Sequence, residues 1–135
     1  MKKALFLLIT FLSSISCEKT TNYVYQLIDS DIVIRMSEEL GNPTRSFELG
    51  LQTDKAYPCI NYILLASSTT TTEKISVEVF GINAPMVCLT ALGPACSVLP
   101  VANIQNKTYD IEFKIGTNIS TGILICTSSE FKLQM

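Results

Sequence analysis

The sequence predicts an all-β protein, a single-domain antiparallel β-sandwich of the immunoglobulin-like kind with about seven to nine short strands. Apolar and polar residues alternate with a period of two in several segments, which is typical of strands with one face in the core and one in water. Stretches rich in Gly, Pro, Asn, Asp and Ser separate these segments. Residues 23–135 are long enough to bury one core, and no repeat or linker divides them.

The alternation is clearest in three segments, residues 47–51, 75–79 and 109–115. Residues 62–65 are apolar on both sides, as expected for a central strand or one that meets a partner. The shorter strand candidates are residues 23–28, 32–36, 86–90, 123–127 and 131–133.

Residues 32–40 also fit a helix. Asp31 is a suitable N-cap, and Ile32, Met36 and Leu40 are spaced to fall on one helical face. The three successive β-branched residues at the start of this segment favour a strand, because their side chains are restricted in a helical turn. We therefore expect a strand here.

The N-terminus has the pattern of a secretory signal peptide. Two lysines lie at its start, and residues 4–12 form an apolar run. This run matches the apolar region of a signal but falls short of the ~20 apolar residues of a membrane-spanning helix. The small side chains of Ser14 and Ser16 predict cleavage before Cys17, so we expect residues 1–16 to be the signal peptide.

Residues 14–17, Ser-Ile-Ser-Cys, resemble the lipobox of bacterial lipoproteins, in which the cysteine becomes the first mature residue and is lipidated. Most members of that class have Leu at the position of Ser14. The resemblance implies that acyl chains such as palmitate anchor Cys17 in the bacterial cell envelope, at the periplasmic or outer face of the outer membrane. Residues 17–22 would then be a tether. The alternative is ordinary cleavage that leaves Cys17 as a free thiol.

The chain has five cysteines, an odd number that needs an explanation in an exported protein. Assigning Cys17 to the lipid leaves four cysteines, which predicts two disulfides in an oxidising compartment. Three pairings are open to them, and we favour Cys88 with Cys96 and Cys59 with Cys126. A metal site is not expected, because the chain has no histidine and no C-x₂-C spacing.

The segment 85–100 is strongly apolar and contains three prolines and two cysteines. If a disulfide closes it, residues 92–97 form a preorganised loop that also has room for a helical turn. The candidate binding residues in this loop are Leu92, Gly93, Pro94, Ala95 and Ser97. Alternatively, the apolar residues of this segment cap one end of the sandwich.

No motif predicts catalysis or a cofactor. The chain has no histidine, no G-x-S-x-G and no glycine-rich phosphate loop. The carboxylates of residues 29, 31, 38 and 39 are expected in exposed turns. The mature chain has 8 basic and 12 acidic residues and no basic cluster, which excludes nucleic-acid binding.

The mature domain resembles no named family. We therefore expect a non-enzymatic, membrane-tethered binding module of the cell envelope that recognises a protein or a glycan. The alternative function is a disulfide-stapled lipoprotein inhibitor of a secreted hydrolase, with residues 92–97 entering the active site.

Overall fold

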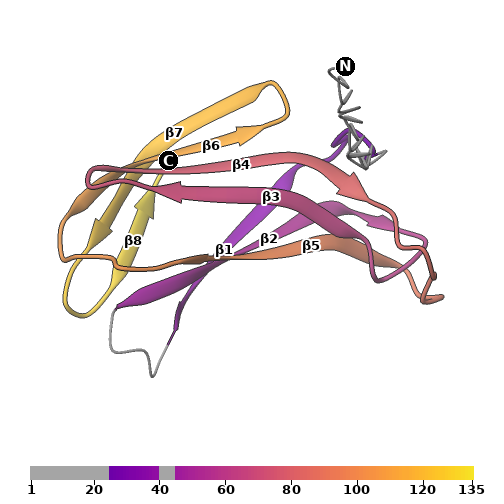
Figure 1. Ribbon diagram of the computed structural model, residues 1–135, viewed down its shortest axis with the longest axis horizontal. Coiled ribbons are helices and arrows are strands. Elements are labelled where there is room, and N and C mark those ends of the chain that lie inside the picture. Colours follow the sequence, from indigo (N-terminus) through magenta and orange to yellow (C-terminus); the bar gives the residue numbers. More distant parts are fainter. Residues whose placement is uncertain (1–24, 40–44) are drawn as a thin grey trace, which may run out of the picture.

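A computed structural model describes residues 25–39 and 45–135, and this part of the chain is all-β (Figure 1). Eight strands and no helix occur in it. The strands are β1 (Ile32–Glu39), β2 (Ser46–Tyr57), β3 (Ile63–Thr70), β4 (Lys74–Asn83), β5 (Gly93–Val101), β6 (Thr108–Ile115), β7 (Asn118–Cys126) and β8 (Phe131–Gln134).

The strands form one mixed sheet in the order β1-β2-β5-β3-β4-β6-β7-β8. The expectation of a purely antiparallel arrangement is wrong, because β3 pairs with β5 and β4 pairs with β6 in parallel. The cause is the path of the chain. After β4 it crosses to place β5 beside β2, and then returns to place β6 on the free side of β4 (Figure 1).

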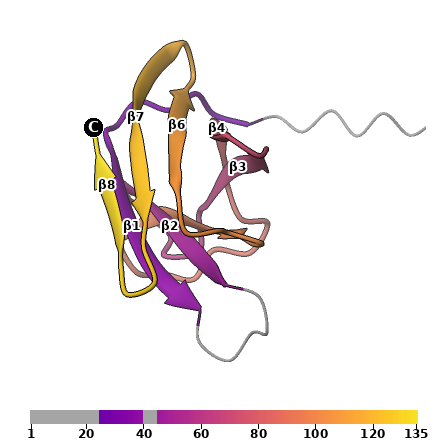
Figure 2. The same cartoon turned by 90° about the vertical axis from the view of Figure 1, so that its left-hand side faces the viewer.

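The sheet curls around the core, as the end view in Figure 2 shows. The link between β5 and β3 is slight, consisting of the pair Ile63↔Cys96 and a hydrogen bond from Cys96 N to Tyr62 O at 3.3 Å. The structure thus has eight strands, as expected, in a single curled sheet, and neither a sandwich nor an immunoglobulin-like fold is confirmed.

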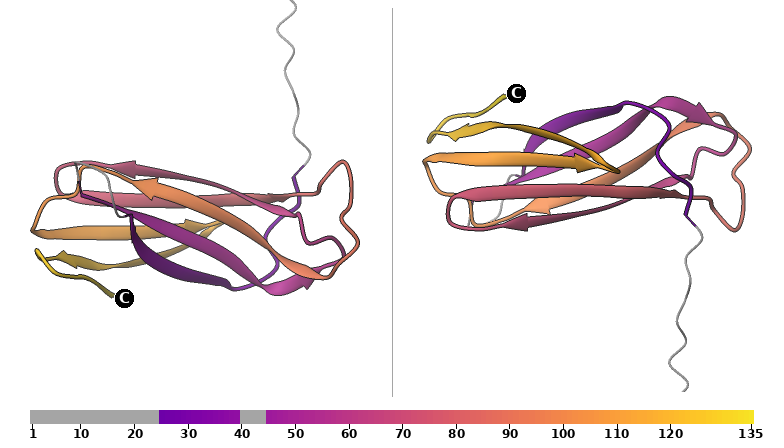
Figure 3. Two further views of the ribbon diagram at one scale, coloured as in Figure 1. Left: turned by 90° about the horizontal axis from the view of Figure 1, so that it is seen from below. Right: turned by 90° about the horizontal axis from the view of Figure 1, so that it is seen from above.

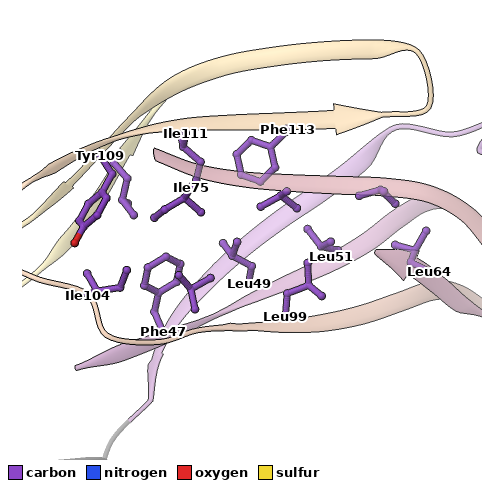
Figure 4. Close-up of a cluster of buried hydrophobic side chains, with 14 of the residues drawn as sticks. Phe47, Leu49, Leu51, Leu64, Ile75, Leu99, Ile104, Tyr109, Ile111 and Phe113 are labelled. Atoms are coloured by element: carbon purple, nitrogen blue, oxygen red, sulfur yellow. The ribbon is translucent and has the colours of Figure 1, made fainter. Parts of the chain in front are cut away.

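The core fills the space inside the curl (Figure 4). Alternate residues of β2 and β5 face alternate residues of β4 and β6, as the period-two pattern requires. Burying each large aliphatic or aromatic side chain contributes roughly 1.5–3 kcal/mol. The largest fully buried side chains are Phe47, Leu49, Leu51, Leu64, Ile75, Val77, Val79, Ile82, Val101, Ile111, Phe113 and Leu124.

Arg45, just before β2, joins the two ends of the curled sheet. Its guanidinium pairs with Glu38 of β1 at 2.9 Å and lies 4.2 Å from the ring centroid of Phe131 in β8. It also donates to the Asn106 side chain at 2.9 Å and to the carbonyl of Thr127. One side chain therefore holds together strands from opposite edges.

Most of the predicted strands are confirmed, although β1, β2, β3, β4 and β7 each extend several residues beyond the predicted segment. The confirmed segments are residues 32–36, 47–51, 62–65, 75–79, 109–115, 123–127 and 131–133. The first of these is a strand and not the competing helix, as its β-branched residues indicated.

Two expectations in the apolar segment are wrong. Residues 86–90 form a loop, and residues 92–97 have no helical turn because all but the first of them belong to β5. Of the candidate strand 23–28, the described part makes one isolated bridge, between Gln26 and Ile82.

The signal peptide over residues 1–16, the lipidation site Cys17 and the tether over residues 17–22 lie outside the described residues. Within the described ranges, no helix has the length and apolar character needed to cross a membrane.

Candidate functional site: an apolar end held by a disulfide

Two connections meet at one end of the molecule, on the right in Figure 1. They are residues 58–62, between β2 and β3, and residues 84–92, between β4 and β5. A disulfide between Cys59 and Cys88 joins them, with the two Cα atoms 5.2 Å apart. We call residues 58–62 and 84–92 the stapled end.

This disulfide corrects the expected pairings. Cys88 does not pair with Cys96, and Cys59 does not pair with Cys126; Cys96 is a free exposed thiol and Cys126 a free buried one. β2 and β4 finish at the same end of the sheet, which brings Cys59 and Cys88 together. Cys126 ends β7 at the other end, where its backbone N–H donates to Lys107 O at 3.0 Å (Figure 1).

The side chain of Asn61 fixes the backbone of the longer loop. Its Nδ2 donates to Val87 O at 2.8 Å, and its Oδ1 accepts from Leu89 N at 3.2 Å. The backbone N–H of Ile60 donates to Leu89 O at 3.3 Å. Three hydrogen bonds and a disulfide therefore hold residues 87–89 against residues 59–61.

Gly93 allows the shorter loop to approach β5. A Cβ at this position would lie 2.8 Å from Ile60 Cγ1 and 3.1 Å from Ile60 Cα. Real side chains do not make contacts this close to both a side chain and a backbone atom, so residue 60 reaches its position only because residue 93 is glycine.

The stapled end exposes large apolar side chains. Met86 is fully exposed, Leu92 is 78% exposed and Val87 is 74% exposed. Leu89 and Ile60 are each more than half exposed. Soluble monomers seldom display such side chains together, and a cluster of them marks a surface that meets a partner.

The stapled end is also without charge. The sequence has no charged residue between Lys55 and Glu73, and none between Glu78 and Lys107. Ion pairs on the outer face of the sheet lie elsewhere, such as Lys74–Glu112 at 3.0 Å. This surface therefore cannot bind a partner through complementary charges, and it must bind through apolar contacts.

The five predicted binding residues do not form one exposed loop in the structure. Leu92 lies in the stapled end and is exposed. Gly93 and Ala95 are buried in β5, while Pro94 and Ser97 are half-buried there. The expectation of a disulfide-held loop over residues 92–97 is therefore wrong. The exposed segment that the disulfide holds is residues 84–92.

Sequence reasoning missed the residues that build this end. The sequence predicts a strand over residues 86–90, and nothing in it indicates that Asn61 supports a loop 26 residues away. The usable signals are the apolar character and the lack of charge of the stretch that contains Cys88.

The described chain begins beside the stapled end. Gln26 and Ile82 exchange two backbone hydrogen bonds of 2.9 and 3.0 Å. The ring of Tyr25 lies on Gly81, where a Cβ would come within 2.4 Å of its Cδ2. This first segment is therefore fixed to the last residues of β4, immediately before the loop at residues 84–92.

A second region is an open hollow of about 510 Å³ lined partly by Asp29, Asp31, Asp54 and Lys55. Lys55 forms an ion pair with Asp29, and the hydroxyl of Tyr57 donates to the same carboxylate at 3.2 Å. The hydrogen bond from Lys55 lowers the pKa of Asp29 below its ordinary value, against the opposing effect of desolvation. In this hollow the Asp29 carboxylate is therefore ionised and already paired with Lys55.

Comparison with known protein families, curated proteins and solved structures found no match to this chain. Within residues 25–39 and 45–135, no group of three or more His, Cys, Asp or Glu side chains is placed to hold a metal ion. The stapled end is the candidate site on its geometry and chemistry alone.

Proposed function

We propose that this protein is a membrane-tethered, non-catalytic binding module of the bacterial cell envelope, and that the stapled end is its recognition surface. The observation that carries the proposal is an apolar loop that is exposed at Met86, Val87 and Leu92 and yet held rigid by Cys59–Cys88 and Asn61. A loop already fixed in its bound shape loses little entropy on docking.

The tether is supported by the sequence, which has a signal-like N-terminus ending in Ser-Ile-Ser-Cys17. The intact mass of the protein extracted from native membranes tests it. Acyl chains on Cys17 are expected. An unmodified Cys17 thiol would remove the membrane from the proposal.

Met86 is a natural probe of the recognition surface, because its side chain is fully exposed in the isolated protein. We expect peroxide to oxidise Met86 readily in purified protein but slowly in intact cells, where a partner covers it. Met135 is the control, since it is 63% exposed and is the C-terminal residue, and the C-terminus lies away from the stapled end (Figure 1). Equal protection factors for the two methionines would contradict the assignment of the surface.

An inhibitor of a secreted hydrolase is the alternative function, because a rigid exposed loop also suits insertion into an active-site cleft. The corrected loop makes residues 84–92 the inserting segment. In that case Leu92→Asp abolishes inhibition of a target hydrolase while the fold survives, since the Leu92 side chain is 78% exposed. Unchanged inhibition by this variant would rule out the loop.

We further propose that the curled sheet is a two-layer sandwich, in which β1, β2 and β5 form one layer and the other five strands form the layer that packs against it. Support comes from the single pair Ile63↔Cys96 that links β3 to β5, against six registered pairs between β4 and β6. Amide exchange tests this layering. The Cys96 amide is expected to exchange faster than the amides shared by β4 and β6.

A further inference from the structure

We propose that the partner of the stapled end is the lipid surface itself: Met86, Val87, Leu89 and Leu92 enter the boundary between headgroups and acyl chains of the membrane that carries the anchor. This inference rests on the proposed function, because the anchor on Cys17 supplies the proximity. It adds a second, non-covalent attachment point and fixes the orientation of the domain.

The chemistry of the surface favours lipid. Interfacial binding grows with the apolar area that enters the boundary region. Charged side chains are the ones that resist such insertion, and none occurs between Lys55 and Glu73 or between Glu78 and Lys107. The mature chain as a whole is acidic, with 12 acidic against 8 basic residues, so its net charge does not attract it to an anionic bilayer.

The position of the tether brings this surface to the bilayer. In both views of Figure 3 the indigo start of the described chain lies toward the stapled end. Tyr25 is fixed there by Gly81, and Gln26 by Ile82. Residues 17–24 span at most about 28 Å when fully extended. An anchored Cys17 therefore holds this side of the domain close to the membrane.

Because the tether is short, a small apolar surface is enough to hold the stapled end on the bilayer. Once the acyl chains have inserted, contact between the loop and the bilayer is intramolecular, and its effective concentration is high. The disulfide and the Asn61 hydrogen bonds keep the apolar side chains presented in one arrangement. Weak insertion of a few side chains is then enough to orient the domain.

The absence of tryptophan from the chain gives a direct test. Full-length protein, processed and acylated in a bacterial host, carries Val87→Trp as its single tryptophan and is reconstituted into vesicles of phosphatidylethanolamine and phosphatidylglycerol. Thr72→Trp is the matched control, because Thr72 is exposed in the turn after β3, at the opposite end of the molecule (Figure 1). Brominated lipids serve as the quencher.

If the proposal holds, the emission of Val87→Trp shifts to the blue and most of it is lost to the brominated lipid, whereas Thr72→Trp is unaffected. Adding Leu92→Asp to Val87→Trp should reverse the quenching, because a carboxylate resists the boundary region. Protein that floats with the vesicles while the two tryptophans are quenched equally would overturn the lipid contact and leave the anchor intact.

Failure of the proposed function gives a different result, since protein without acyl chains would not float with the vesicles at all. Protection of Met86 in intact cells, together with no quenching of Val87→Trp in protein-free vesicles, would also overturn the lipid contact. That combination assigns the stapled end to a protein partner instead.

Discussion

At the scale of single residues, the bond between Cys59 and Cys88 has a large expected effect on stability. It links residues 29 apart in sequence, and closing such a loop in the unfolded chain contributes roughly 3.6 kcal/mol by chain entropy. We expect the double variant Cys59→Ala, Cys88→Ala to lower the free energy of unfolding by about that amount in urea titrations. The control Cys96→Ser removes an exposed free thiol and should change stability by less than about 0.5 kcal/mol. A large effect of Cys96→Ser would contradict the pairing.

The ion pair of Asp29 and Lys55 predicts a pH dependence. Lys55 lowers the pKa of Asp29, so the pair stabilises the fold above the ordinary value of 3.8, and this contribution is lost as the pH falls. Asp29 raises the pKa of Lys55, so the contribution is also lost as the pH rises beyond 10.5. The stability difference between the wild type and Asp29→Asn should therefore be constant near neutral pH and shrink on both sides. A difference that grows below pH 3.8 would contradict the pair.

At the scale of elements, the attachment of the first segment to β4 depends on Gly81. A Cβ at this position would overlap the ring of Tyr25, with atoms 2.4 and 2.9 Å away. We expect Gly81→Ala to detach the segment, so that the amides of Gln26 and Ile82 lose their protection from hydrogen exchange at a cost of about 1–3 kcal/mol.

The matched control combines Gly81→Ala with Tyr25→Ala, which removes the ring that the new methyl group meets. This double variant should recover protection at Ile82 in part, since the clash is gone while the backbone pair remains. Independent, additive effects of the two substitutions would show that Tyr25 does not pack on Gly81.

The strands differ in how well the sequence predicts them. Alternation predicts β2, β4 and β6 because each has one buried and one exposed face, a property that is local to the strand. It missed β5, whose prolines at residues 94 and 100 argue against an inner strand. These prolines are tolerated because β5 is almost unpaired on the side of β3, where a single bridge occurs.

The candidate site was harder to predict, because it is made by contacts between segments distant in sequence. The crossing from β4 to β5 decides that Cys88 meets Cys59 rather than Cys96, and composition contains no information about that crossing. The apolar character of residues 85–92 was visible in the sequence, but the position of the exposed loop was not.

At the scale of the whole molecule, Arg45 keeps the curled sheet closed. Arg45→Met loses the pair with Glu38, the bonds to Asn106 and Thr127, and the contact with Phe131. We expect a loss of about 2–4 kcal/mol, since partly buried hydrogen bonds to a charged group are strong. Lys74→Met breaks a partly exposed ion pair with few other contacts instead and should cost no more than about 1 kcal/mol. Equal losses in the two variants would show that the sheet does not depend on Arg45 for closure.

Alkylation of the two free thiols, Cys96 and Cys126, tests whether the curled sheet stays closed. Cys96 is exposed and should react with an alkylating reagent in the native protein, without reductant. Cys126 is 3% exposed, and burial raises the pKa of its thiol, so its reaction requires unfolding. Its alkylation rate should follow the free energy of unfolding and rise in Arg45→Met. If neither thiol reacts before reduction, even in denaturant, a second disulfide is present and the arrangement around the closure of the sheet must differ from the one described.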